Sequence, residues 1–282
     1  MKAFSSIFFS ICLWLVSFLG FSNFAGAAEN SFIQAVQERG VLTVGIPGFD
    51  SPPAYGVSEE SGELEGYDIE VARGLAKKLN VGVQFDRSSA NLNDLVRRVA
   101  TGDFDIAIGK LGRTYQRLFD AFPVHYLDFR HALLANRTFL SELPDEPGTP
   151  GFSKVLEQSA IKIGSLQGSI WKQETADNFP NASFVGYKNW SDAQRALFDG
   201  RVDAIYRDMT EIKSLVYARP DLIIDYVPII FDDVVDQKSI YLSRDGAVDF
   251  SPFIQFYIAK EWGGVKTDVA ILDEFKSFYS AS

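Results

Sequence analysis

The chain has 282 residues, of which 46% are apolar and 23% charged, enough to bury one large or two medium cores, and this excludes a disordered protein. Lysine and arginine number 27 against 37 aspartates and glutamates, so the net charge of -10 argues against a nucleic-acid-binding surface. The single cysteine, Cys12, excludes an internal disulfide, a site with several thiolate ligands and a C-x-x-C redox pair.

The N-terminal segment has the pattern of a secretory signal. Lys2 is followed by no further charge until Glu29, residues 7–21 are mostly large and apolar, and Ala25-Gly26-Ala27 supplies the small residues of a cleavage site. We therefore expect residues 1–27 to be a cleaved signal peptide, which leaves no cysteine in the mature chain. The alternative is an uncleaved anchor, since the apolar stretch approaches the roughly 20 residues that span a bilayer.

The next hundred residues predict a β-α-β-α-β order. An apolar run at 41–46 indicates a strand, and apolar residues recur on one helical face from Ile69 to Leu79. Alternation at 81–85 indicates a second strand, Asn91 is expected to cap a helix that Gly102 ends, and 104–108 is expected to be a buried strand. This order builds a parallel sheet with right-handed crossovers.

The second half of the chain repeats this order. Strands are predicted at 161–165, 182–187 and 202–206, with helices at 169–178 and 191–199 between them. Three residues recur 98 positions later: Arg97, Gly102 and Asp105 are matched by Arg195, Gly200 and Asp203. The matching order of elements is stronger evidence for two similar halves than these identities.

The loop between the halves and the C-terminal segment indicate how the halves are connected. Residues 141–152 contain three prolines and predict a surface loop. After an acidic turn at Asp232-Asp233 we expect a strand near 238–243, then helices at 249–262 and 268–279 that pack on the first lobe, because they have no sheet of their own. The first lobe would comprise 28–135 and 237–282 and the second 136–236, so two crossings form a hinge.

Five motifs in this order carry a resemblance to a known family. They are Pro52-Pro53, the Gly-x-x-x-Gly-Tyr-Asp-x-Glu stretch at 62–70, the Gly-x-x-Asp strand at 102–105, the Thr-x-x-Arg turn at 114–117, and Gly-x-x-Asp-Ala-x-x-x-Asp at 200–208. From about residue 31 to about residue 279 the chain resembles the family 3 extracellular solute-binding proteins, the polar amino-acid receptors of bacterial ABC importers.

The resemblance implies an α/β fold of the two-lobed periplasmic binding protein type II. Each lobe would be a mainly parallel sheet flanked by helices, and a two-strand hinge would join them. It also implies a non-catalytic, monomeric receptor in the periplasm, without cofactor or metal, that passes a small amino acid or carboxylate to an inner-membrane ABC permease.

Candidate binding residues follow from the resemblance. An α-amino acid carries a carboxylate and an ammonium, so a receptor needs a cationic fork and a fixed anion. The resemblance gives the first role to Arg117, which follows Thr114 in its turn, and the second to Asp208. Backbone N–H groups at the helix led by Ser169 would add donors. Asp208 and Ser169 are also good helix caps, which is the alternative interpretation of each.

The chain departs from the family pattern before the Thr-x-x-Arg turn. Gly112 offers only its backbone N–H where a hydroxyl residue is frequent. Lys110 and Arg113 add positive charge beside Arg117, which suggests a ligand with a second anionic group, such as an acidic amino acid or a dicarboxylate. The alternative is that these side chains point to solvent or pair with Asp105 or Asp120.

Aromatic residues are expected near the ligand. Phe49 or Tyr55, on either side of the two prolines, would stack on the ligand, with Phe49 preferred. Trp171, after Ile170, would form an apolar wall of the site or belong to the core.

The main alternative function is a dehydratase, because a few relatives on this fold dehydrate cyclohexadienyl acids. Glu211, one helical turn after Asp208, would then be the general acid, and its alternative interpretation is a solvent-facing helix residue. His125 and His131 are the only histidines, and their spacing does not suit a paired metal site.

Overall fold

The computed structural model describes residues 31–275. The predicted signal peptide with Cys12, and the end of the last predicted helix, lie outside the described residues. Within residues 31–275, the helices are all too short or too polar to cross a bilayer.

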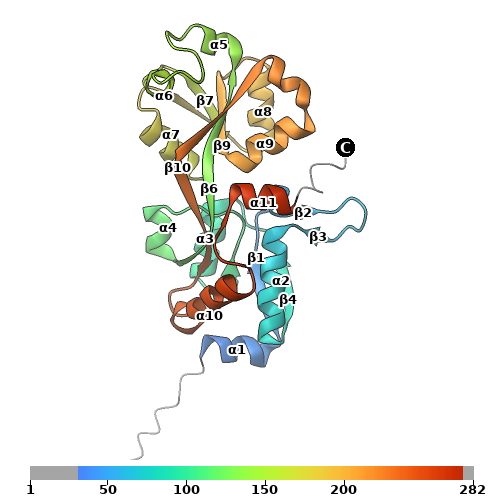
Figure 1. Ribbon diagram of the computed structural model, residues 1–282. Coiled ribbons are helices and arrows are strands. Elements are labelled where there is room, and N and C mark those ends of the chain that lie inside the picture. Colours follow the sequence, from blue (N-terminus) through green and yellow to red (C-terminus); the bar gives the residue numbers. More distant parts are fainter. Residues whose placement is uncertain (1–30, 276–282) are drawn as a thin grey trace, which may run out of the picture. The chain divides into compact units, whose positions relative to one another are not determined.

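The first group of elements contains the predicted parallel strands and helices. Strand β1 (Val41–Gly45) pairs in parallel with β4 (Gly82–Asp86) and with the short β5 (Ile106–Ala107). Helices α2 (Tyr67–Leu79) and α3 (Leu92–Ala100) connect them (Figure 1). Asn91 caps α3 as predicted, because its Oδ1 accepts the backbone N–H groups of Asn93 and Asp94, both at 3.0 Å.

The second group repeats this arrangement. Strand β7 (Lys162–Leu166) pairs in parallel with β8 (Ser183–Tyr187) and β9 (Ala204–Asp208). Helices α7 (Trp171–Asn178) and α8 (Trp190–Phe198) lie between them in sequence. The element order predicted for both halves is therefore confirmed.

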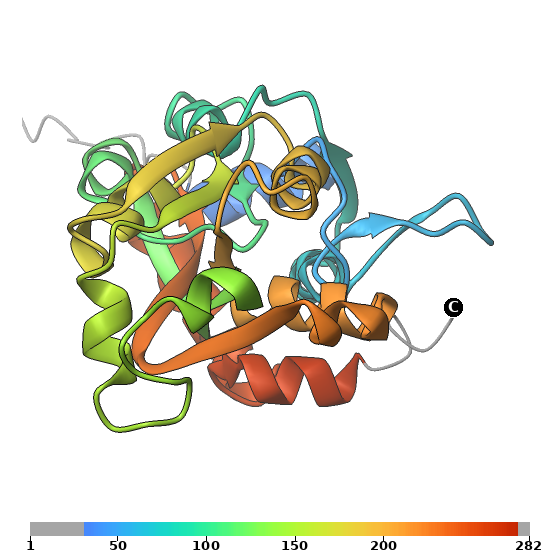
Figure 2. The same cartoon turned by 90° about the horizontal axis from the view of Figure 1, so that it is seen from above.

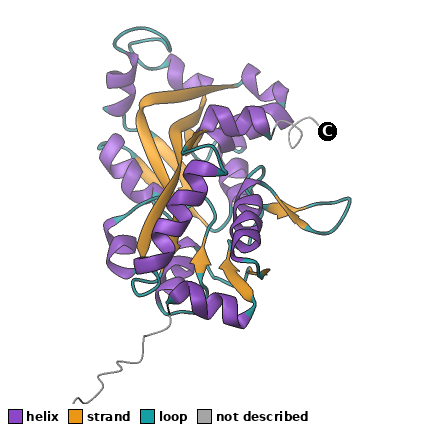
Figure 3. Ribbon diagram, turned by 60° about the horizontal axis from the view of Figure 1, so that its bottom comes forward, coloured by secondary structure: helices purple, strands orange, loops and turns teal. Residues whose placement is uncertain are grey.

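Two long antiparallel strands run through both groups. Strands β6 (Phe122–Asn136) and β10 (Tyr226–Leu242) pair along most of their length and complete a sheet of order β4-β1-β5-β10-β6-β9-β7-β8 (Figures 1 and 3). The turn predicted at Asp232-Asp233 is wrong: β10 continues through it with a shift of register between Phe231 and Val235. A bulge can absorb extra residues without ending the pairing.

Helix α9 (Met209–Ala218) begins after Asp208, where the sequence indicated a helix. The structure also contains elements that the sequence did not predict: α1 (Phe32–Arg39), β2 (Gly56–Val57), β3 (Leu64–Glu65), α4 (Tyr115–Asp120), α5 (Arg137–Ser141), α6 (Phe152–Glu157), the 3₁₀ helix η1 (Pro220–Ile224) and β11 (Lys266–Thr267). The β2–β3 hairpin projects from the molecule (Figure 2). Most of these elements are too short to show a periodic pattern.

The last two helices cover the first group of strands. Phe250 and Ile254 of α10 (Ala247–Lys260) pack in one core cluster with residues of β1 and α2, as expected. In α11 (Asp268–Glu274), Ile271 joins the same core, whereas Leu272 packs with residues of α8 and α9. Helix α11 therefore contacts both groups of elements.

Candidate functional site

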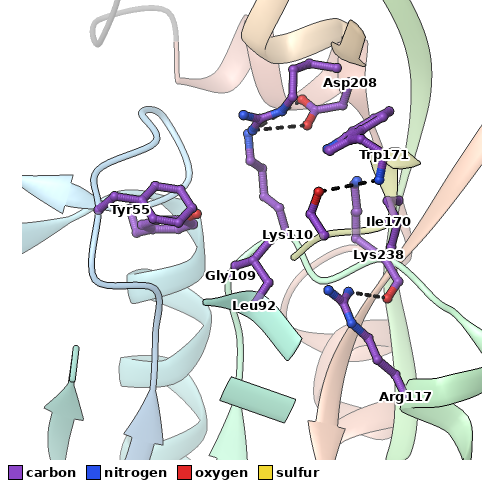
Figure 4. Close-up of a pocket in the computed structure, with 13 residues that line it drawn as sticks. Tyr55, Leu92, Gly109, Lys110, Arg117, Ile170, Trp171, Asp208 and Lys238 are labelled. Carbon is purple, nitrogen blue, oxygen red and sulfur yellow. Dashed lines mark hydrogen bonds and ion pairs between the residues drawn. The ribbon is translucent and has the colours of Figure 1, made fainter. Parts of the chain in front are cut away.

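A pocket lies where the two groups of elements face each other (Figure 4). Its lining comprises Phe49, Tyr55, Leu92, Gly109, Lys110, Gly112, Arg117, Ser169, Ile170, Trp171, Arg207, Asp208 and Lys238. Side chains fill most of the space and leave a cavity of about 20 Å³, room for about one water molecule. Seven of the eight residues predicted from the sequence to touch ligand lie in this lining, and they come from both groups: Arg117 lies in the first group and Asp208 in the second.

The remaining predicted residue, Thr114, lies outside the lining. Thr114 is the N-cap of α4, where its hydroxyl accepts the backbone N–H of Arg117 at 3.2 Å. Its role is therefore to shape the turn that presents Arg117.

Arg117 is held in a fixed orientation by neutral oxygens. Its Nε and Nη2 donate to Oδ1 of Asn93 at 3.0 and 2.8 Å, and its Nη1 donates to the carbonyl of Gly112 at 2.8 Å. The side chain is 1% exposed, and this burial lowers the pKa of its guanidinium, which nonetheless stays charged at neutral pH. Among the described residues it forms no ion pair.

Asp208 both lines the pocket and caps a helix. It ends β9, and its Oδ1 accepts the backbone N–H of Glu211 at 3.3 Å and the hydroxyl of Thr210. Burial alone would raise the pKa of this carboxyl, but the charges of Lys110, Lys238 and Arg207 outweigh it and hold the pKa well below its usual range. Asp208 is therefore ionised at neutral pH.

Lys110 points into the pocket, toward Asp208 (Figure 4). Its Nζ donates to Oε1 of Glu211 at 2.5 Å and lies 3.5 Å from Oδ1 of Asp208. The alternative that Lys110 faces solvent or pairs with Asp105 is wrong, since Lys110 is buried and Asp105 pairs with Arg39 at 2.5 Å. The positive charge that the sequence suggested is present in the pocket, and it already has partners.

Glu211 is buried, so its interpretation as a solvent-facing helix residue is wrong. It lies in the first turn of α9, directly after Asp208, and the beginning of this helix is buried. Its Oε1 accepts hydrogen bonds from Lys110 and from the hydroxyl of Ser51, and lies 3.3 Å from Nη2 of Arg207. Burial raises the pKa of its carboxyl, but Lys110 and Arg207 more than compensate, so the pKa is lowered.

Arg207 and Lys238 line the pocket although sequence reasoning missed both. The guanidinium of Arg207 lies 4.8 Å from the centre of the Trp190 ring, a cation–π distance, and its Nε and Nη1 are buried without a hydrogen-bond partner in residues 31–275. Lys238 pairs with Asp236 and lies 5.4 Å from the ring centre of Trp171. The sequence did contain a signal for these residues: each is a basic residue within a strand that is otherwise largely apolar or buried, where a charge requires a partner.

Gly112 is needed where the two groups of elements approach each other. A Cβ at this position would lie 2.7 Å from Oδ1 of Asp236 and 2.7 Å from Cδ1 of Ile170. Its carbonyl also accepts the hydroxyl of Tyr241 at 2.9 Å, beside the bond from Arg117. Gly112 therefore lets its loop lie close to Asp236 and Ile170, and its carbonyl helps to orient Arg117.

Ser169 and Trp171 occupy the start of α7. The Ser169 hydroxyl donates to the carbonyl of Leu166 at 2.7 Å, so it serves the local turn, and the helix itself begins two residues later. Trp171 lines the pocket and is also 3% exposed within a core cluster, so both of its interpretations hold.

Both candidate aromatic residues line the pocket. Phe49 is partly buried, Tyr55 is fully buried, and their ring centres lie 6.1 Å apart in an edge-to-face arrangement. Arg113, in contrast, is not among the lining residues: its Nε donates to the hydroxyl of Ser239 at 2.9 Å and its Nη1 to Oε1 of Gln237 at 2.9 Å.

The two histidines have separate surroundings. His131 is buried behind the pocket, where its Nδ1 lies 2.5 Å from the hydroxyl of Tyr206, and burial lowers the pKa of its imidazole to about 4. The Nε2 of His125 lies 2.8 Å from Oδ1 of Asp128. Across the part of the chain that the structure describes, no group of three or more histidine, cysteine or acidic residues is arranged to hold a metal ion.

Known proteins resemble this chain in sequence. Residues 42–138 match the sequence profile of the bacterial extracellular solute-binding proteins, family 3. An arginine-binding periplasmic protein of Mannheimia haemolytica is 25% identical over 166 residues, covering 58% of this chain and 62% of that protein. A glutamine-binding protein of Geobacillus stearothermophilus is 23% identical over 189 residues, covering 64% of this chain and 66% of that protein.

Solved structures share the fold. An amino acid ABC transporter substrate-binding protein from Streptococcus pneumoniae, bound to L-arginine, has a TM-score of 0.68 at 23% identity and covers 88% of this chain and 99% of its own. The ancestral amino acid-binding protein described as a precursor of cyclohexadienyl dehydratase has a TM-score of 0.68 at 19% identity, with coverage of 89% and 100%. Residues 42–138 thus carry the sequence pattern of the family 3 bacterial extracellular solute-binding proteins, and the chain shares the two-lobed α/β fold of type II periplasmic binding proteins.

Proposed function

We propose that the protein is a periplasmic receptor that captures a small amino acid or a related carboxylate between its lobes and delivers it to an ABC importer. The observation that carries this proposal is that Arg117 and Asp208, which come from different lobes, line one buried pocket. The names of the relatives support it, since they describe proteins that bind arginine, glutamine and cystine.

The proposed lobes follow the boundaries expected from the sequence. We assign 28–135 and 237–282 to the first lobe and 136–236 to the second. Among the described strands, only β6 and β10 connect the sheets of the two lobes, which suits a hinge that opens and closes the pocket. The receptor would act as a monomer in the periplasm after removal of residues 1–27, and its partner would be an inner-membrane permease.

Arg117 supplies the proposed carboxylate clamp. A planar guanidinium can donate two parallel hydrogen bonds to a carboxylate, and the bonds to Asn93 and Gly112 hold it in one orientation. A hydrogen bond to a charged group contributes roughly 1.5–3 kcal/mol. Three or four such bonds therefore suffice for a dissociation constant near micromolar, which corresponds to about -8 kcal/mol.

Native mass spectrometry of the protein purified from its own periplasm tests this function. A receptor of this kind is expected to retain solute, so a mass increment that disappears after mild denaturation and reappears on adding the identified compound is the expected result. A protein that carries no increment and binds no compound from a periplasmic extract would contradict the proposal.

A dehydratase is the second candidate, because Glu211 is a buried carboxyl in contact with Lys110 and Arg207, two residues that line the pocket. A general acid requires a protonated carboxyl near neutral pH, whereas Lys110 and Arg207 lower the pKa of Glu211. The ion pairs with Lys110 and Arg207 therefore keep the Glu211 carboxyl ionised and disfavour proton donation from it. Incubation with arogenate and prephenate, followed by detection of the aromatic product, tests it; we expect no product.

A further inference from the structure

The buried side chains around the pocket carry more positive than negative charge. The four cations are Lys110, Arg117, Arg207 and Lys238, and the three carboxylates in contact with them are Asp208, Glu211 and Asp236. All seven are buried. Asp68 lies behind the backbone of Lys110 and outside the lining, and burial raises the pKa of its carboxyl to about 7. The pocket is therefore better suited to an anion than to a further cation.

Lys110 already occupies the position that a ligand ammonium would take. Its Nζ lies 3.5 Å from Oδ1 of Asp208, the carboxylate proposed to hold such a group, and 2.5 Å from Oε1 of Glu211. A bound α-amino acid would bring a second ammonium to carboxylates that are already paired. Like charges at such distances in a buried site repel strongly, because little solvent screens them.

The backbone places Lys110 in the pocket at some cost. Its φ is 51°, in the left-handed region that residues with a Cβ seldom adopt, and the preceding Gly109 has a φ of 148°. The left-handed conformation is unfavourable for a residue other than glycine, because its Cβ comes too close to the following carbonyl oxygen. From this backbone conformation the Lys110 side chain reaches both Glu211 and Asp208.

Two guanidinium groups at the pocket are incompletely matched by carboxylates: Arg117 has no ion pair among the described residues, and Arg207 approaches Glu211 and Asp208 only through its Nη2. Arg117 is bonded only to neutral oxygens. Arg207 is 4% exposed, lines the pocket, and leaves Nε and Nη1 without hydrogen bonds within the described residues. Buried N–H donors of a charged group require acceptors, and a carboxylate matches the fork of a guanidinium.

We infer that this pocket selects a small carboxylate without an α-ammonium group, because Lys110 supplies from the chain itself the ammonium that an amino acid would bring. The inference rests on the proposed function, since it names the class of solute that the same pocket takes. Arg117 and Arg207 would receive the carboxylate, while Lys110 remains paired with Asp208 and Glu211.

Matched pairs of compounds test the inference. Each pair consists of an amino acid and the acid with the same side chain and no amine, for example glutamate with glutarate, leucine with 4-methylpentanoate, and phenylalanine with 3-phenylpropanoate. All protein amino acids that have such a counterpart are screened by thermal shift, and hits are titrated by calorimetry. For the wild type we expect the amine-free member of the best-binding pair to bind at least tenfold more tightly.

Variants at Lys110 provide the decisive comparison. Lys110→Met leaves Asp208 available to a ligand ammonium, so the preference within that pair should reverse. Lys110→Met combined with Glu211→Gln tests the same reversal with one fewer uncompensated carboxylate, in case the single variant does not fold. Lys188→Met, at an exposed position, removes the same charge elsewhere and should keep the wild-type preference. Circular dichroism confirms that each variant is folded.

The outcomes separate this inference from the proposed function. A wild-type protein that binds any amino acid more tightly than its amine-free counterpart overturns the inference and leaves the receptor function standing. A preference that Lys110→Met and the double variant both leave unchanged also overturns it, because Lys110 would then not be the cause. If neither the wild type nor the variants bind any member of either class, both the inference and the proposed function fail.

Discussion

At the scale of single residues, Arg117 is the most direct test of binding. Arg117→Ala removes the proposed clamp and should weaken binding of the native solute by about 2–5 kcal/mol, since truncating one partner of a buried charged contact has this effect. Titration calorimetry measures it. Arg113→Ala is the matched control, because Arg113 bonds to Ser239 and Gln237 outside the pocket lining. Equal affinities of the wild type and Arg117→Ala would remove Arg117 from the site.

His131 predicts a loss of stability in mild acid. Its folded-state pKa of about 4 is lower than the ordinary 6.5, so between these values the unfolded chain binds a proton that the folded chain does not. The free energy of unfolding should therefore fall as pH is lowered through this window, by up to about 1.4 kcal/mol per pH unit from this residue. Asp68, with a raised pKa, acts in the opposite direction.

Comparison with a variant isolates the contribution of His131. His131→Phe keeps an aromatic ring beside Trp171 and Tyr206 but takes up no proton. Urea unfolding at several pH values should show the wild type losing more stability than this variant between pH 6.5 and 4. His125→Phe, at a less buried site, should follow the wild type closely. Parallel pH profiles of the wild type and His131→Phe would show that His131 does not titrate in this way.

At the scale of elements, Gly112 determines how closely the loop after β5 approaches α7 and β10. Gly112→Ala places a methyl group 2.7 Å from both Ile170 Cδ1 and Asp236 Oδ1, so either these side chains or the loop must shift. Overpacking of this kind costs roughly 1–3 kcal/mol, which denaturant unfolding would measure. Gly82→Ala is the control, because its nearest atom would lie 3.6 Å away. An unchanged stability of Gly112→Ala would show that the neighbouring side chains yield freely.

At the scale of the whole molecule, the two connecting strands predict a change of shape on binding. Most core residues of the two lobes fall in different clusters, although Ile271 and Leu272 of α11 join one cluster of each lobe. Within residues 31–275 the sheets are continuous only through β6 and β10. Small-angle scattering should therefore show a smaller radius of gyration after addition of the solute identified by mass spectrometry. The same radius with and without solute would show that the lobes do not move. The packing of α11 against core clusters of both lobes would then be the contact that restrains them.

The sequence by itself determined the order of the regular elements and the residues to consider at the pocket. Hydrophobic periodicity is a local property, so the strands and helices on either side of Asn91, and their repeat in the second half, could be predicted from it. The motifs around Arg117 and Asp208 likewise stand in the sequence, and the structure brings both residues to one pocket.

Only the tertiary structure decided how these side chains are paired. Lys110 and Glu211 are separated by 101 positions, and their ion pair depends on how the lobes meet, which no local pattern records. The same holds for Arg207, whose role depends on which face of β9 borders the pocket, and for β10, which continues past Asp232 because β6 lies beside it to accept its hydrogen bonds. Ion pairs and strand pairing join residues that are distant in sequence, so they appear only once the chain is folded.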